Sequence, residues 1–257
     1  MPSEDELNAI CYPNNYLTRV IARIDLVSPV EALANELPKE LSKAALGMFP
    51  ISEPRQAVTQ ELFISPQGPR TRNKRFTVWN FHGKTREKRL EITQQYVLVS
   101  YSKYEKYELL RNEFDSILNA FFGEYNQAQP SKLGLRYINA LTIGGEENPL
   151  KWDTYINNEL LDLFGYQVEG AKPARIFHNM EFAFDNFCLR FQFGIHNPDY
   201  PAPIRQRHFI LDFDAYNKGL LEPTNVITEL DSFHTQIQHL FERSITETTR
   251  GFLNEVK

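Results

Sequence analysis

The sequence has little cysteine and no long apolar run, and each shortage excludes a class of protein. Two cysteines, Cys11 and Cys188, stand far apart among 257 residues, which makes neither a disulfide framework nor a metal knuckle. No segment approaches the roughly 18 consecutive apolar residues typical of a membrane-spanning helix. Residues 1–6 are acidic, unlike the positively charged start of a secretory signal. We therefore expect a cytoplasmic protein that does not bind a membrane.

Catalytic and cofactor-binding motifs are also missing. The sequence holds no nucleophile elbow, phosphate-binding glycine loop, dinucleotide fingerprint or kinase signature. His234 and His239 are five residues apart, about 140° around a helix axis, so they do not share a face as a zinc pair four residues apart would. The sequence therefore predicts a non-catalytic protein without a metal ion or a cofactor.

The composition is that of a globular chain rich in aromatic residues. Apolar residues make up 42% of the chain and charged residues 24%, which excludes a disordered protein. The 19 Phe and 12 Tyr favour sheet surfaces over a helical bundle. The length predicts one large domain or two small ones.

Hydrophobic periodicity predicts the main elements. Alternating residues indicate strands at 19–26, 75–82, 91–101, 133–143 (ended by Gly144 and Gly145), 187–196 and 209–213. Steps of three and four indicate helices at 30–41 (broken at Pro38), 107–121 (ended by Gly123), 152–164 and 230–245. Residues 50–75 contain four prolines and predict a loop around a short strand at 61–64.

The order of these elements, strands and then a helix, twice, predicts an α+β fold. Each half would place an amphipathic helix on an antiparallel sheet, and the two sheets would join edge to edge. We expect an N-terminal half at 1–143, a connector with a short helix at 144–175, and a C-terminal half at 176–257. Apolar positions step by 4, 3 and 1 from Leu110 and again from Phe233, which indicates an internal duplication, although any strand–strand–helix unit gives such steps.

The sharpest anomaly is a basic region at residues 70–89. It has eight basic residues and one acidic residue, a net charge of +7, so the rest of a chain of charge −5 carries −12. The charges flank a predicted strand that contains Trp79. The predicted binding residues are Arg70, Arg72, Lys74, Arg75, Trp79, Lys84, Arg86, Lys88 and Arg89.

Three interpretations fit this basic region. Basic side chains beside aromatic rings suit phosphate neutralisation and base stacking, which indicates nucleic acid. The same side chains suit an acidic protein surface, and they also suit a solvated loop whose charges protect a sheet edge. Because no catalytic motif is present, we expect an interaction or adaptor protein that contacts another protein through this region, with nucleic acid as the alternative ligand.

A second candidate site lies on the predicted strand at 209–213 and just beyond it. His208, Asp212 and Asp214 alternate and share one face, where they could bind a divalent cation or act in acid–base chemistry. The simpler interpretation is cross-strand ion pairing, with Arg190 bonded to Asp212 or Asp214.

The segment 133–139 (LGLRYIN) places polar residues in an apolar strand. Arg136 must be paired or lie on a solvated face, and Asn139 needs hydrogen-bond partners on the opposite face. The two residues either face a ligand or belong to a buried network that fixes the sheet register.

Three segments, residues 16–29 (YLTRVIARIDLVSP), 133–139 (LGLRYIN) and 231–246 (DSFHTQIQHLFERSIT), resemble an uncharacterised, sporadically distributed bacterial family. Its members are about as long as this chain, and the most specific piece is the GLRYIN motif. The resemblance implies a standalone cytoplasmic protein, inherited patchily as an accessory protein of antiviral, CRISPR-type loci. It implies no catalytic residues.

Overall fold

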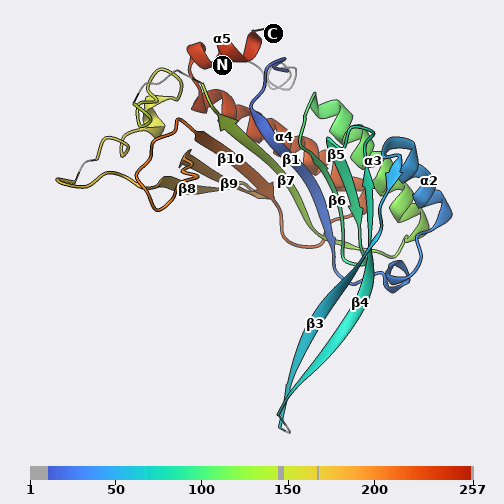
Figure 1. Cartoon of the computed structure of the whole chain (residues 1–257). Coiled ribbons are helices and arrows are strands. Elements are labelled where there is room, and N and C mark those ends of the chain that lie inside the picture. Colours follow the sequence, from blue (N-terminus) through green and yellow to red (C-terminus); the bar gives the residue numbers. More distant parts are fainter. Residues whose placement is uncertain (1–10, 67, 144–147, 167, 256–257) are drawn as a thin grey trace.

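One large antiparallel sheet dominates the fold (Figure 1). The computed structural model describes residues 11–66, 68–143, 148–166 and 168–255, so the acidic residues 1–6 and the two glycines at 144 and 145 lie outside the described residues. The strands are β1 (Leu17–Leu26), β2 (Ile51–Ser52), β3 (Arg55–Ser65), β4 (Gly68–His82), β5 (Lys88–Ile92), β6 (Tyr96–Tyr101), β7 (Pro130–Leu141), β8 (Ile176–Ala183), β9 (Cys188–Ile195) and β10 (Phe209–Tyr216). The helices are α2 (Lys39–Met48), α3 (Tyr107–Glu124), α4 (Val226–Ser244) and α5 (Glu247–Asn254), with 3-10 turns η1 (Glu31–Ala34), η2 (Asn158–Leu160) and η3 (Pro223–Asn225).

Strands β1 and β7 pair at the centre of the sheet. The strand order is β2-β4-β5-β6-β1-β7-β10-β9-β8, with β3 paired to β4 off this path. Ala22 of β1 lies opposite Leu135 of β7. Strands β4–β6 form one meander and strands β8–β10 form another. Strand β6 pairs with β1 and precedes helix α3, and strand β10 pairs with β7 and precedes helix α4. Because β7 is also hydrogen-bonded to β10, the sheet is continuous across the boundary expected at residue 143.

The helices cover one face of this sheet (Figure 1). Strand β1 shows why, because Val20, Ala22 and Ile24 are fully buried, whereas Arg19 and Arg23 occupy the alternate positions. This alternation confirms the predicted strand, and the same pattern recurs in β9. None of the helices within the described ranges has the length and apolar content needed to cross a membrane.

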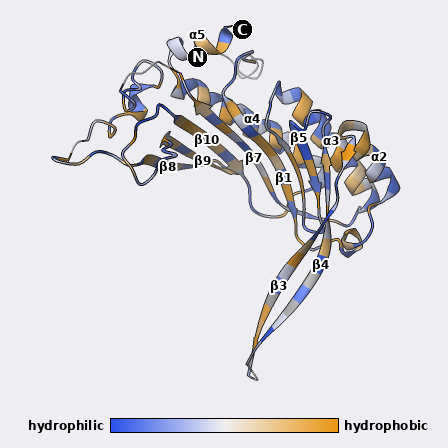
Figure 2. Cartoon of the chain, in the orientation of Figure 1, coloured by the Kyte–Doolittle hydropathy of each residue, from blue (hydrophilic) through white to orange (hydrophobic). Residues whose placement is uncertain are grey.

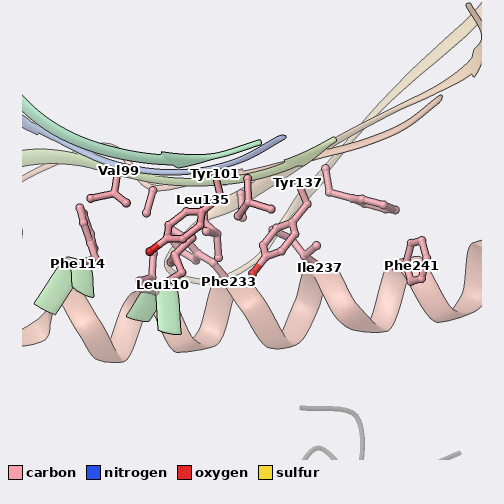
Figure 3. Packing of buried hydrophobic residues seen from close by; sticks show 14 of the residues in the cluster. Val99, Tyr101, Leu110, Phe114, Leu135, Tyr137, Phe233, Ile237 and Phe241 are labelled. Carbon is pink, nitrogen blue, oxygen red and sulfur yellow. The ribbon is translucent and has the colours of Figure 1, made fainter. Parts of the chain in front are cut away.

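The core lies between the sheet and the helices α3 and α4 (Figure 3). Phe114 of α3 and Phe233 of α4 are fully buried, and they point toward sheet residues such as Leu135. Burying one such side chain contributes roughly 1.5–3 kcal/mol. The apolar stripes in the sequence that predicted α3 and α4 are therefore the faces that these helices bury. The predicted α+β fold is confirmed.

The segment predicted as one strand at 91–101 is two strands, β5 and β6. A turn at Thr93 separates them, since the Thr93 amide donates to Tyr96 O (3.0 Å). The Thr93 hydroxyl accepts from the amides of Gln95 (3.1 Å) and Tyr96 (3.0 Å). A side chain that satisfies two amides makes a tight turn without glycine or proline, which the apolar pattern did not reveal.

The loop expected at 50–75 is wrong, because this segment forms most of a long hairpin, although the short strand expected at 61–64 is confirmed as part of β3. Strands β3 and β4 pair continuously from Arg55 opposite Val78 to Ser65 opposite Gly68. The four prolines fall outside the pairing or at its far end, where a missing amide costs least.

Three further expectations need correction. The predicted helix at 30–41 is two elements, η1 and α2, and Pro38 stands at the N-cap of α2. Gly123 lies inside α3, which ends at Glu124. The helix expected at 152–164 is wrong, because the helical element of this described segment is the short 3-10 turn η2. Strand β8 follows the connector where no strand was expected.

Candidate functional site

The distal part of the β3–β4 hairpin projects from the body of the protein (Figure 1). We define the arm as residues 57–76, from the pair Ala57–Phe76 to the turn. Eight residue steps separate that pair from Ser65, a length of about 27 Å at about 3.4 Å per residue. None of the described residues from 58 to 75 belongs to the hydrophobic core. An isolated two-stranded ribbon is only marginally stable in water. The arm is therefore unusual, because the core does not support its described residues.

One face of the arm carries an exposed apolar stripe. Val58, Leu62 and Ile64 lie on one face of β3, with Gln60 between the first two, and are 59%, 64% and 85% exposed. Phe63, on the opposite face, is 50% exposed. Figure 2 shows hydrophobic colour along the distal part of β3 and hydrophilic colour on the middle of β4. Clustered exposed apolar side chains of this size are typical of an interaction surface.

Strand β4 brings basic residues to the same arm. Arg70 lies opposite Phe63 and Arg75 lies opposite Val58, and both arginines are exposed. The backbone register places Arg72 opposite Glu61 and Lys74 opposite Thr59. With four basic residues and one acidic residue, the arm has a net charge of +3. The predicted residues Arg70, Arg72, Lys74 and Arg75 therefore lie together on the arm.

The other predicted basic residues lie at the base of the hairpin, around the β4–β5 turn. Arg86 donates to Glu53 (3.1 Å), and Lys88 forms an ion pair with Glu113 of α3. Arg89 contacts Glu91 at 3.1 Å. Lys84 is exposed in the turn. The structure therefore divides the predicted basic region, because three of its four residues at the base are already paired with carboxylates of the same chain.

Trp79 does not form the platform for base stacking that the basic residues around it in the sequence suggested. Its indole Nε1 donates to Leu33 O at 2.8 Å, and its ring packs against the core. Beside it, the Thr77 hydroxyl donates to Ala34 O at 2.7 Å. These two bonds hold η1 against the base of the hairpin, so Trp79 anchors the arm to the body of the protein.

The face with Asp212 and Asp214 is an ion-pair ladder, as the simpler interpretation predicted. Arg136 donates to both oxygens of Asp212, at 2.8 and 2.6 Å. Arg190 forms an ion pair with Asp214 on the neighbouring strand. Burial lowers the pKa of His208, and its ring contacts His196. No group of three residues among those described could hold a metal ion.

The LGLRYIN segment sends its two polar residues to opposite faces of the sheet. Arg136 lies on the face without helices, in its pair with Asp212. Asn139 lies on the helix side, where it is 5% exposed and donates to Leu211 O at 3.4 Å. The two residues therefore do not form one ligand-facing pair.

Sequence reasoning missed a small cavity beside Asn139. It opens between the N-terminal segment that precedes β1, the start of α3, the end of β7 and helix α4, and its volume is about 80 Å³. The polar and aromatic residues at its centre are Tyr104, Tyr107, Tyr137, Asn139, His234 and Phe241. Their positions in three distant segments, before and at the start of α3, in β7 and in α4, hide them from any local motif.

A chain of hydrogen bonds runs through this cavity wall. The hydroxyls of Tyr104 and Tyr137 are 3.1 Å apart, and the Tyr137 hydroxyl is 3.1 Å from His234 Nδ1. Figure 3 shows Tyr137 pointing from the sheet toward α4. Tyr107 stacks on His234 and donates to Asp231 at 2.7 Å. These contacts hold α3, α4 and β7 together.

Burial keeps these groups neutral at pH 7. It lowers the pKa of His234 to about 4, an effect that nearby Asp231 opposes. Burial also raises the pKa values of Tyr104, Tyr107 and Tyr137 above their ordinary value of 10. The inner wall therefore presents hydroxyls, an imidazole and an amide, all uncharged.

Comparison with known protein families and with curated protein sequences found no relative of this chain. No model of a known protein family matches the chain, and no curated protein sequence is significantly similar to it.

Proposed function

We propose that this protein is a non-catalytic interaction protein that contacts another protein through its arm. The observation that supports this proposal is the arm itself, a projecting ribbon with an exposed apolar stripe and basic residues. Exposed Val58, Leu62 and Ile64 would lose contact with water when a partner covers them, which favours association. Arg75 lies beside Val58 on this face and Arg70 beside Phe63 on the other face, so the arm suits a partner that wraps it with apolar and acidic groups.

The arm supports this role better than the base of the hairpin does. At the base, Lys88 and Arg89 already have carboxylate partners, so a second partner would have to compete with them. We therefore narrow the predicted contact surface from residues 70–89 to the arm, which holds Arg70, Arg72, Lys74 and Arg75.

Site-specific crosslinking in the native host tests this proposal. A photoreactive residue placed at Leu62 should capture one partner protein, whereas the same residue at exposed Lys84 should not. Arg70→Glu and Arg75→Glu together should abolish the capture at Leu62. Equal capture at both positions, or capture that survives both charge reversals, would contradict the proposal.

Nucleic acid is the alternative ligand of the same arm. A two-stranded ribbon fits the major groove, and four basic residues suit phosphates. The apolar stripe favours a protein, because exposed Val58, Leu62 and Ile64 offer no hydrogen bonds to phosphates or bases. Fluorescence anisotropy with a labelled duplex distinguishes the two, since binding that falls steeply with salt and vanishes in the double charge reversal would favour nucleic acid.

We also propose that the two halves of the chain arose by duplication. Strand β1 with the β4–β6 meander and α3 follows the same order as β7 with the β8–β10 meander and α4. The repeated helix steps from Leu110 and Phe233 support the same proposal. A structural superposition of the two halves that leaves the paired strands out of register would contradict it.

The cellular role that we propose is that of a cytoplasmic accessory protein in a bacterial antiviral, CRISPR-type locus. The support is the resemblance of the 134–139 motif and its two companion segments to a patchily inherited family. Infection assays with and without the gene test the role. Equal phage resistance in both strains would contradict it.

A further inference from the structure

The cavity beside Asn139 has the construction of a small-molecule site. It lies where the sheet centre meets both helices, and its walls include the apolar side chains of Leu17, Ile237 and Phe241. Ligand sites are mostly apolar, with a few polar groups that fix orientation. This cavity has that composition.

Two polar atoms in the cavity wall remain available for a ligand. Asn139 and His234 are 5% and 6% exposed, and both line the cavity. The Asn139 Nδ2 donates to Leu211 O, and His234 Nδ1 faces the Tyr137 hydroxyl. Asn139 Oδ1 and His234 Nε2 have no hydrogen-bond partner among the residues that the structure describes. Neither atom is among the fully buried polar atoms without a partner in the described part of the chain, so solvent reaches both of them, and a ligand in the cavity would take its place.

The charge of the wall decides the class of ligand. Tyr104, Tyr137, Asn139 and His234 are all neutral at pH 7, and the charged residues of the cavity, such as Glu105 and Lys106, are exposed at its rim. An ionised group placed inside would lose its hydration without gaining an opposite charge, which is costly. An uncharged group with hydrogen-bonding capacity would not incur this cost.

We propose that this cavity binds the neutral amide or lactam group of a small molecule, through Asn139 and His234. Such a group offers an N–H and a C=O side by side, and it matches one amide oxygen and one imidazole nitrogen. Since a water molecule occupies about 30 Å³ of liquid, about 80 Å³ holds a group of a few heavy atoms, and the rest of the ligand would extend through the opening. This site is separate from the arm and does not rest on the function proposed for it.

Three matched probes test the ligand class. Nicotinamide carries the neutral amide, nicotinate replaces it by a carboxylate, and pyridine lacks it. With isothermal titration at millimolar concentration, we expect saturable binding of nicotinamide and at least about tenfold weaker binding of the other two. Equal binding of all three, or no saturable binding of nicotinamide, would overturn the proposal.

Two variants and one control test the location. His234→Phe keeps the ring stack but removes Nε2, and Asn139→Leu removes Oδ1, so each should weaken nicotinamide binding about tenfold, which corresponds to about 1.4 kcal/mol. His239→Phe changes a histidine of the same helix outside the cavity lining and should leave binding unchanged. Unchanged binding in both cavity variants would overturn the location.

A spectroscopic readout keeps the test independent of folding defects. In wild-type protein with ring-labelled tyrosine, nicotinamide should shift the NMR signals of Tyr104 and Tyr137 and leave Tyr216 unchanged. Shifts at Tyr216 without shifts at Tyr104 and Tyr137 would overturn the proposal. A chain without the arm should still bind nicotinamide, so failure of the arm proposal and failure of this one are distinguishable.

Discussion

The imidazole ring of His234 lies flat against the phenol ring of Tyr107, with ring centroids 3.8 Å apart and planes inclined by 9°. Tyr107 is the first residue of α3, and His234 belongs to α4. Asp231, one turn before His234, accepts from both Tyr107 and Arg111 of α3. The two helices are therefore joined by a ring stack and by three hydrogen bonds to Asp231, beside the cavity.

The first prediction concerns the pH dependence of stability. The pKa of His234 is about 4 in the folded chain and 6.5 in the unfolded chain, so the unfolded state binds more protons between these values. The free energy of unfolding should therefore be highest above pH 6.5 and fall as the pH falls toward 4. Urea denaturation across this pH range should show a loss from this group on the order of 3 kcal/mol.

His234→Phe isolates this effect from carboxylates that titrate nearby. The difference in unfolding free energy between wild type and this variant should shrink as the pH falls from 7 to 4. His239→Phe serves as the control on the same helix. A difference that stays constant with pH would show that His234 does not titrate as the structure requires.

The second prediction concerns the ion pair between Arg136 and Asp212. Both Asp212 oxygens accept from Arg136, and the Asp212 side chain is only 10% exposed. A double-mutant cycle with Arg136→Met and Asp212→Asn should give a coupling energy of about 1–2 kcal/mol. The exposed pair Arg243–Glu159, at 3.6 Å, should give less than about 0.5 kcal/mol. Equal coupling in the two cycles would be inconsistent with the buried geometry.

The third prediction concerns the arm and the stability of the body. Replacing residues 58–75 by Asn-Gly, which makes a tight hairpin turn, should change the free energy of unfolding by less than about 1 kcal/mol. The reason is that none of the described residues among those removed belongs to the hydrophobic core. Phe81→Ala, in the buried part of the same strand, should cost about 3–5 kcal/mol. A truncated chain that fails to fold would mean that the arm supports the sheet.

The fourth prediction concerns Gly194 in β9, which has a φ of 151°. A Cβ at this position would lie 2.1 Å from Ile176 O of β8, a distance that the backbone cannot accept. Gly194→Ala should destabilise the protein by more than about 2 kcal/mol and speed amide exchange in β8. At Gly134 the nearest atom would be Ala215 O at 3.8 Å, so Gly134→Ala should change stability by less than about 0.5 kcal/mol. Similar effects at both glycines would contradict this account.

Most strands and helices of the body could be predicted because each has one buried face. In β1 and β9, burial alternates with a period of two, and in α4 it follows the helical repeat. The hairpin at 55–82 was not predicted as a unit, because its arm has no buried face. Both faces of its arm are exposed, so no alternation between apolar and polar residues was needed, and the prolines suggested a loop.

The binding residues were only partly predictable. The cluster of charges at 70–89 was visible in the sequence, but its division was not. Arg86 and Lys88 are neutralised by Glu53 and Glu113, which come from distant parts of the chain. Arg70, Arg72, Lys74 and Arg75 lie instead on the arm, which projects from the body of the protein (Figure 1).

The sequence by itself determined the α+β class, the identity of most elements and the absence of catalytic motifs, because these depend on local periodicity and residue type. Only the tertiary structure decided that β1 pairs with β7, that the arm stands apart and that His234 closes a cavity with Tyr137 and Asn139. The β1–β7 pairing and the cavity depend on contacts between segments about a hundred or more residues apart, and such contacts leave no local pattern in the chain. The arm was hidden because both of its faces are exposed.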